Sequence, residues 1–315
     1  MKTRKVLSIV LVLLMMTAIL AACGGGAKEE PAAQEPKEFA FFISHMTNAF
    51  TIELSDAVKA KAAELGVNVT VNDGGKDAAK QISQIETTVN QGIDGIIIEP
   101  VSVDAIIPAV KAATEAGIPV VIVNQQISDP SAASAYVGVA NKDGGALEMT
   151  KAVEDLGGKG NVAILLGPMG SDAQIGRSEG YKAVIDANPG VTVVFESTAN
   201  WTTDEALKLV ENWLQSGKEI NAIVAQNDGM ALGALKAVED AKLQDKIKVY
   251  GLDATPDALA AVKEGRLAAT VSQSTTTQGL EAMNTVYKLA MGETVEPELL
   301  VDFTLITSEN VDEFL

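Results

Sequence analysis

The fold is decided by the stretch Ala222-Ile-Val-Ala-Gln-Asn-Asp-Gly-Met-Ala-Leu-Gly-Ala-Leu235, within which the hydrophobic periodicity changes. It opens with an apolar run to Ala225 that is short enough for a strand buried on both faces. The apolar residues then follow helical spacing, and Asp228 is expected to cap that helix through a free amide of its first turn. Asn227 thus stands at the carboxyl end of a buried parallel strand, where open α/β sheets bind ligands. The alternative is that Asn227 only serves the turn.

Two further predicted strands end on a polar residue, and this repetition favours a ligand site over a simple turn. Ile247–Asp253 ends on Asp253, and Ala268–Gln273 ends on Gln273. The carboxyl ends of parallel strands meet at one edge of a sheet. We therefore expect Asn227, Asp253 and Gln273 to face one crevice.

Strands and helices alternate strictly along the remaining chain, with short connections. This order predicts an α/β protein with doubly wound parallel sheets, and about six strands per half predict two similar Rossmann-like lobes. No G-x-G-x-x-G follows a strand and no P-loop occurs, which argues against nucleotide-binding domains. Further predicted strands are 38–43, 67–71, 95–98, 118–123, 135–139, 161–166 and 191–195, and a single final strand lies near 299–305.

The charge of the chain argues against nucleic acid as a partner. The 315 residues carry a net charge of -18. The first 22 residues include three basic side chains and no acid, so their removal would bring the charge to -21. Such an acidic surface also argues against electrostatic binding to anionic lipid.

The amino terminus has the pattern of a bacterial lipoprotein signal. A basic segment precedes the apolar run Val6–Leu20, whose 15 residues are fewer than the about 20 that a membrane span needs. The run ends in Leu20-Ala-Ala-Cys23, which resembles a lipobox. Cys23 is the only cysteine, so an internal disulfide is excluded, and its glycine-rich flank makes a buried thiol a poor alternative. We expect a signal peptide over 1–22, a lipid anchor at Cys23 and a flexible tether over 23–37.

Four motifs, taken together, resemble the ribose/galactose type of periplasmic sugar-binding proteins. They are Ala225–Leu235, Gly251-Leu-Asp-Ala-Thr-Pro256, Gly265-Arg-Leu-Ala-Ala-Thr270 and Ile118-Pro-Val-Val121. The resemblance runs from about residue 39 to 307. It implies a type I periplasmic binding protein that encloses a sugar between two lobes, with chain crossings near 140–141, 273–274 and 302–303. The amino-terminal lobe would then comprise 38–140 plus 274–302, and the carboxy-terminal lobe 141–273 plus 303–315.

Two aromatic residues are candidates for stacking on a sugar ring. Aromatic residues make up 4% of the chain, so those beside predicted loops are informative. The resemblance places Phe50 and Trp201 at stacking positions, one on each lobe. The alternative for Phe50 is core packing against Leu54, while a hydrophobic staple from Trp201 would meet only Ala206. Trp213 has core spacing and is interpreted as packing.

The resemblance also assigns the polar ligand contacts. Asp253 is expected to accept hydrogen bonds from a pair of hydroxyls, although capping of the next helix is an alternative. His45 is interpreted as a rim or packing residue, and a metal site is excluded for lack of partners. The predicted polar set is Asn48, Asn124, Gln125, Asn227, Asp253 and Gln273.

The sequence departs from the ribose-binding pattern at two positions. Asn124-Gln125 stands where that pattern has Asp-Arg, and Ile175 occupies the position of a second arginine, with Arg177 one helical step away. We therefore expect no lysine or arginine at the crevice. The expected ligand is a neutral sugar or cyclitol rather than ribose, a sugar acid or a sugar phosphate.

The resemblance implies a binding protein that delivers its ligand to an ABC permease, and we expect a monomer without a cofactor. A Rossmann-type enzyme is disfavoured because phosphate fingerprints and acid–base pairs are missing. A sugar-responsive repressor would need a basic DNA-binding segment where the signal sequence stands. A receptor that presents its ligand to a chemoreceptor or kinase stays open.

Overall fold

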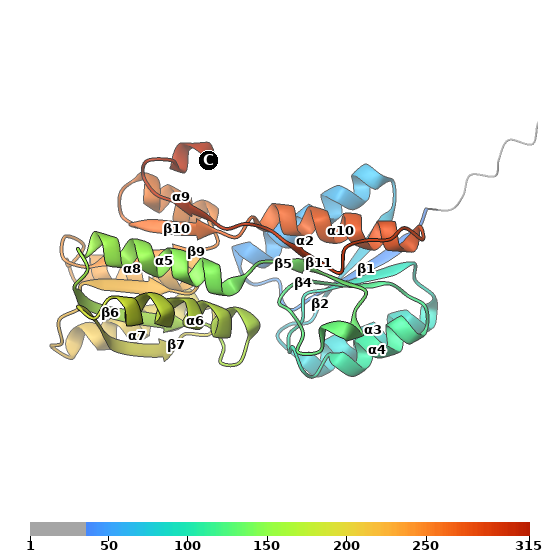
Figure 1. Ribbon diagram of the computed structural model, residues 1–315, viewed down its shortest axis with the longest axis horizontal. Helices are drawn as coiled ribbons and strands as arrows, with labels where there is room; N and C mark the ends of the chain where they lie inside the picture. The colour runs from blue at the N-terminus through green and yellow to red at the C-terminus, as the bar shows by residue number, and fades with distance from the viewer. Residues whose placement is uncertain (1–35) are drawn as a thin grey trace, which may run out of the picture. The chain divides into compact units, whose positions relative to one another are not determined.

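The computed structural model describes residues 36–315, which form two α/β lobes. Each lobe is a six-stranded sheet with helices on both faces, as Figure 1 shows. Strand pairs are parallel throughout the described residues except at one edge of the second sheet, where the final strand runs antiparallel. The predicted doubly wound architecture is confirmed.

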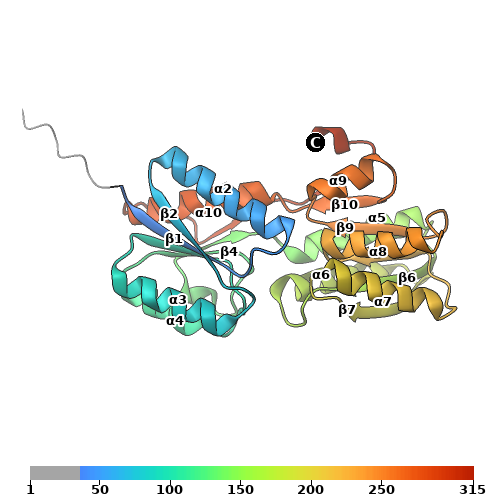
Figure 2. The same ribbon diagram turned by 180° about the vertical axis from the view of Figure 1, so that it is seen from behind.

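The first lobe is built on residues that alternate between two helical layers. Phe41 packs with Leu54 on one face of the sheet, and Phe42 packs with Val110 on the other. Its helices are α2 (Ala49–Leu65) and α10 (Thr275–Ala290) on the first face, and α3 (Ala78–Gln91) and α4 (Ile107–Glu115) on the second (Figures 1 and 2). In spatial order its strands are β11 (Glu298–Leu300), β5 (Ala135–Gly138), β4 (Val120–Asn124), β3 (Gly95–Ile98), β1 (Glu38–Ile43) and β2 (Asn68–Asp73).

The second lobe repeats this plan. Trp213 is buried in its core, as predicted, and stacks on Phe195 with ring centroids 5.3 Å apart. The helices are α5 (Asn141–Asp155) and α6 (Asp172–Ala187) on one face, α7 (Thr203–Gln215) and α8 (Asp228–Asp240) on the other, and α9 (Pro256–Lys263) beside β10. In spatial order its strands are β12 (Thr304–Ile306), β10 (Ala269–Ser272), β9 (Lys248–Leu252), β8 (Ala222–Ala225), β6 (Gly160–Leu166) and β7 (Val191–Thr198).

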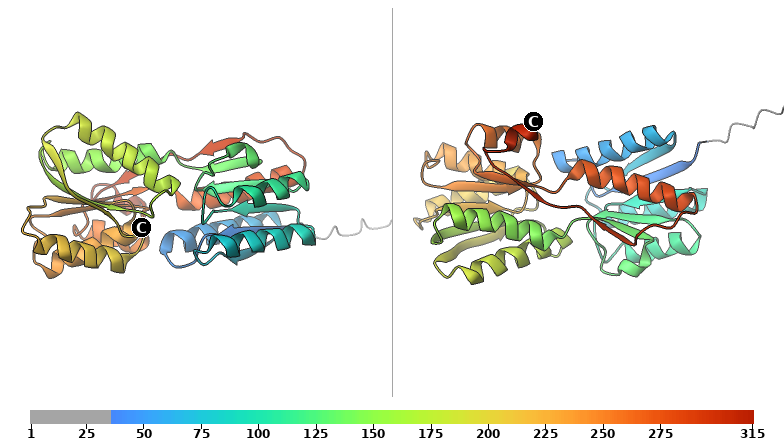
Figure 3. Two further views of the ribbon diagram at one scale, coloured as in Figure 1. Left: turned by 90° about the horizontal axis from the view of Figure 1, so that it is seen from below. Right: turned by 45° about the horizontal axis from the view of Figure 1, so that its top comes forward.

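The chain passes three times from one sheet to the other. The passages lie between β5 and β6, between β10 and β11, and between β11 and β12 (Figure 3). The expectation of a single final strand is wrong, because residues 301–303 carry the chain across. Two short strands therefore form, and each joins a different sheet.

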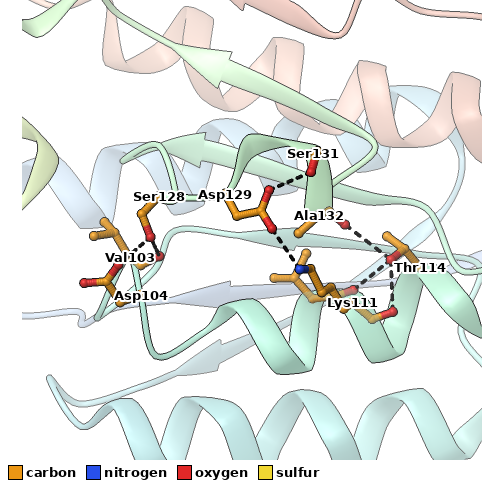
Figure 4. Close-up of polar contacts among 9 residues, drawn as sticks. Val103, Asp104, Lys111, Thr114, Ser128, Asp129, Ser131 and Ala132 are labelled. Carbon is orange, nitrogen blue, oxygen red and sulfur yellow. Dashed lines mark hydrogen bonds and ion pairs between the residues drawn. The ribbon is translucent and has the colours of Figure 1, made fainter.

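The loop after β4 is tied to α4, which fixes the segment that follows Asn124 (Figure 4). Lys111 Nζ lies 2.8 Å from a carboxylate oxygen of Asp129, and the Ser131 hydroxyl donates to the same carboxylate. The Thr114 hydroxyl donates to the carbonyl of Ala132 at 3.2 Å. These contacts hold residues 129–132, which follow Gln125 in the chain, against α4.

Several predictions concern residues outside the described part of the chain. They are the signal peptide over 1–22, the anchor at Cys23 and nearly all of the tether. Within residues 36–315, no helix combines the length and the apolar character that crossing a bilayer requires.

Candidate functional site

A cavity of about 410 Å³ is lined by loops at the carboxyl ends of strands from both sheets. Its size falls within the usual range for small-molecule sites. All eight residues predicted to touch a ligand line this cavity: Asn48, Phe50, Asn124, Gln125, Trp201, Asn227, Asp253 and Gln273. Their contact with a ligand remains a prediction.

Asn48 and Asn227 each cap a helix, and the cap fixes which end of the amide is free. Asn48 Oδ1 accepts from the backbone N–H of Thr51 at 2.9 Å, at the start of α2. Asn227 Oδ1 accepts from the backbone N–H of Met230 at 2.9 Å, at the start of α8. A backbone N–H can only donate, so each amide oxygen is engaged. Both residues therefore retain their NH₂ groups as donors for the cavity that they line.

The expected cap at Asp228 is wrong. Asp228 is the first residue of α8 and is buried, and its carboxylate accepts from the Thr255 backbone N–H at 2.8 Å and the Thr270 hydroxyl at 2.7 Å. Thr255 follows β9 and Thr270 lies within the neighbouring strand β10, so α8 holds this side chain against the sheet. Asp228 thus braces the loop that carries Asp253, while Asn227 supplies the cap.

Asn124 and Gln125 present acceptors, because their amide hydrogens are already used. Asn124 Nδ2 donates to Oε1 of Gln273 at 3.0 Å and of Gln278 at 3.2 Å. Gln125 Nε2 donates to Glu99 Oε1 at 2.7 Å and to the Pro100 carbonyl at 3.3 Å. The Asn124 and Gln125 amide oxygens remain for a ligand.

Asp253 is the acidic residue of the predicted set and lies on the second lobe. Its Oδ1 accepts from Gln273 Nε2 at 2.6 Å, and the side chain is buried. Burial raises the pKa of this carboxyl, and the guanidinium of Arg177 opposes the increase. The second oxygen has no hydrogen-bond partner among residues 36–315 and can exchange a hydrogen bond with a ligand hydroxyl.

The expectation that no arginine reaches the crevice is wrong. Arg177 is 2% exposed and lines the cavity, whereas Ile175 points outward and is 48% exposed. The Arg177 guanidinium donates from Nε to Asn141 Oδ1 at 3.3 Å and from one terminal nitrogen to the Gln226 carbonyl. Its other terminal nitrogen stays available as a donor. The four-residue spacing of Ala173, Arg177 and Tyr181 was the sequence signal that this face of the helix points inward.

Glycines bring α5 and α6 together and so place Arg177. A Cβ on Gly180 would lie 2.2 Å from the Lys142 carbonyl, and one on Gly145 would lie 2.4 Å from the Arg177 carbonyl. The close approach lets Asn141 bridge Arg177 and Asp172, since Asn141 Nδ2 donates to the Asp172 carboxylate at 2.9 Å. That carboxylate also accepts from the backbone N–H of Gln126, on the other lobe, at 3.3 Å.

Phe50 and Trp201 supply the apolar surfaces of the cavity. The Arg177 guanidinium carbon lies 5.7 Å from the centroid of the Trp201 ring, within cation–π range. Trp201 has φ 61° and Asn124 has φ 65°, in a region that side-chain-bearing residues rarely adopt. Strained backbone of this kind gathers at functional sites.

Glu99 lines the cavity and was missed, although it follows a buried strand in the same way as Asn227. Its carboxylate accepts from the Ser44 backbone N–H at 2.8 Å as well as from Gln125. Burial raises its pKa, and these hydrogen bonds oppose the increase. The rim also contains Glu205 and Lys76. Lys76 is a second departure from the expected absence of basic residues. No metal-binding cluster of acidic, histidine or cysteine residues occurs within 36–315.

Comparison with known proteins places this geometry in a family. Residues 39–294 match the model of the periplasmic binding protein domain. The chain is 36% identical over 255 residues to a putative rhizopine-binding protein of Rhizobium meliloti, covering 79% of this chain and 82% of that protein. It is 35% identical over 266 residues to a xylitol-binding protein of Mycolicibacterium smegmatis, covering 84% and 76%.

A solved structure agrees with the sequence relatives. An ABC transporter solute-binding protein from Bacillus halodurans, with bound myo-inositol, superposes with a TM-score of 0.86 at 37% identity, covering 90% of this chain and 99% of that one. The predicted resemblance to sugar-binding proteins of this fold is confirmed. The chain belongs to the periplasmic binding protein family, whose matching members are sugar- or polyol-binding proteins of ABC importers.

Proposed function

We propose that the protein is the substrate-binding lipoprotein of an ABC importer and that it binds a neutral cyclitol between its two lobes. The observation that carries this proposal is the division of hydrogen-bonding roles around the cavity. Donors come from Asn48, Asn227 and Arg177, and acceptors come from Asn124, Gln125 and Asp253. A hydroxyl group both donates and accepts, so a ring with a hydroxyl on nearly every carbon can satisfy both sets.

The charges of the cavity favour a neutral ligand. Glu99 and Asp253 bring buried acidic side chains to the wall and Glu205 adds a third at the rim, against two basic side chains, Arg177 and Lys76. The guanidinium of Arg177 already interacts with the acidic side chains of Asp253, Asp172 and Glu148. A phosphate or carboxylate on the ligand would face these acids with little free counter-charge, so we expect sugar phosphates and sugar acids to be rejected.

The relatives direct the choice among neutral ligands. The matched proteins carry names for rhizopine and xylitol, and the superposed structure holds myo-inositol. We therefore propose a cyclitol of the myo-inositol type, and we expect ribose to bind more weakly because Asn124 and Gln125 replace the charged Asp-Arg pair of the ribose-binding pattern.

The cellular role follows from the proposed anchor. Lipidation of Cys23 would hold the binding lobes at the outer side of the membrane, where a permease receives the ligand. A receptor that passes its ligand to a sensor would use the same cavity, and no described residue favours that role.

Isothermal titration calorimetry against a panel of neutral sugars, cyclitols, sugar acids and sugar phosphates tests the proposal. We expect myo-inositol or a related cyclitol to bind at least tenfold more tightly than ribose, a difference of about 1.4 kcal/mol. Tight binding of ribose or of a phosphorylated sugar alone would overturn the proposed ligand class.

A further inference from the structure

His45 is a buried residue of the cavity wall that the assigned polar set does not use. It lies in the loop after β1, is 7% exposed and lines the cavity. The sequence favoured a rim or packing role for it. The backbone N–H of its neighbour Ser44 donates to Glu99, which also lines the cavity.

The loop determines which imidazole nitrogen carries the proton. The backbone N–H of Thr47 donates to His45 Nδ1 at 3.3 Å, and the Thr47 hydroxyl lies 2.9 Å from the same atom. A backbone N–H cannot accept, so Nδ1 must offer its lone pair. A neutral His45 therefore carries its proton on Nε2.

The surroundings also keep the ring neutral. Burial and then the nearby charge of Lys76 lower the pKa of His45 to about 4, while Asp73 acts in the opposite direction. At neutral pH the side chain therefore presents a single N–H donor and no positive charge.

The Nε2 group has no hydrogen-bond partner among residues 36–315, and its nitrogen is accessible to solvent. Because the ring borders the cavity, a ligand atom can reach this donor. Leaving such a donor unpaired when a ligand excludes water costs about 1–3 kcal/mol, so the site favours a ligand that supplies an acceptor there.

We propose that His45 is a specificity-determining residue that donates one hydrogen bond from Nε2 to a hydroxyl oxygen of the ligand. The inference rests on the proposed function and adds a requirement to it. A ligand must present an oxygen at this position, since a CH₂ group or an ammonium group has no lone pair to offer. Deoxy and amino analogues altered at that carbon should therefore bind more weakly than the parent ligand.

Two substitutions separate this role from support of the loop. In His45→Asn the amide oxygen can replace Nδ1 as the acceptor for Thr47, but no donor reaches the Nε2 position. In His45→Gln the longer side chain can bring an amide N–H to that position. We expect His45→Asn to keep the melting temperature and bind the ligand at least tenfold more weakly, and His45→Gln to stay within about threefold of the wild type.

The monodeoxy analogues of the ligand give the matched control. One analogue, which lacks the hydroxyl facing His45, should bind the wild type and His45→Asn equally, whereas the others should lose affinity in the variant. Equal affinity of His45→Asn and wild type for the parent ligand would overturn the inference and leave the proposed function standing. A wild type that binds no member of the panel would remove the proposed function and this inference together.

A second measurement needs no variant, because His45 is the only histidine in the chain. In protein labelled with ¹⁵N-histidine, long-range nitrogen–proton correlation spectra should show one imidazole with its proton on Nε2. Ligand should shift the Nε2 resonance much more than that of Nδ1. An unchanged Nε2 resonance at saturation, or a proton on Nδ1, would overturn the proposed hydrogen bond.

Discussion

Gly167 leaves the space that the Trp201 indole occupies, so alanine at this position tests whether that indole shapes the binding site. A Cβ built on Gly167 would lie 2.1 Å from two carbons of the indole ring. Ordinary van der Waals contact begins at 3.4 Å, so the ring would have to move by about 1.3 Å. Gly167→Ala therefore displaces Trp201 without removing any polar group of the cavity.

The displacement should weaken binding whichever way the ring moves. Withdrawal by 0.5–1 Å already forfeits about a quarter to a half of a dispersion contact, and movement inward overlaps the ligand. The ring also shifts from its position 5.7 Å from the Arg177 guanidinium. We expect an affinity loss of tenfold or more for Gly167→Ala in calorimetric titrations, about 1.4 kcal/mol.

A double-mutant cycle with Trp201→Ala provides the control. Once the indole is gone, the extra methyl group meets no ring, so Gly167→Ala should cost little further affinity. Gly167 does not have a positive φ, and alanine is therefore free of backbone strain there. Wild-type affinity in Gly167→Ala, or the same loss in the Trp201→Ala background, would refute the reasoning.

Three further predictions concern the buried acids and the anchor. Burial raises the pKa of Glu148 to about 8, so the folded state retains a proton that the unfolded state releases between pH 4.5 and 8, and stability falls as the pH rises through this range. Between pH 5 and 8 the wild type should therefore lose stability relative to Glu148→Gln, by at most about 1.4 kcal/mol of unfolding free energy per pH unit. The melting temperature of the wild type should fall more than that of the variant over this range, and an equal fall would contradict the prediction. Asp253→Ala should weaken ligand binding tenfold or more in calorimetry with an unchanged melting temperature, and a collapsed melting temperature with normal residual affinity would make the residue structural. Cys23→Ala should release the protein from the membrane fraction, and a cleaved variant that still sediments wholly with membranes would exclude the anchor.

Local sequence signals accounted for much of the fold and for part of the site. Strands β1 and β3 begin and end at the predicted residues, because short apolar runs bounded by polar and turn residues mark them. Polar residues after apolar strands led to Asn227, Asp253 and Gln273, which line one cavity in the structure.

The parts that were missed depend on contacts distant in sequence. Arg177 reaches the cavity because α6 packs closely on α5; the spacing of Ala173, Arg177 and Tyr181 indicates an inward face but not that this face borders the cavity. The role of Asp228 depends on Thr255, which follows β9, and on Thr270, which lies in β10. Partners that are distant in the chain are set by tertiary packing rather than by local pattern.

The central claim is that one neutral, polyhydroxylated ring contacts both lobes, and a crystal structure of the protein with its tightest-binding panel member tests it most directly. The account predicts a ring between Phe50 of the first lobe and Trp201 of the second, with hydroxyl groups on the free oxygen of Asp253 and on the amide nitrogen of Asn227. A ligand that contacts only one lobe, or that leaves Asp253 and Asn227 untouched, would contradict it.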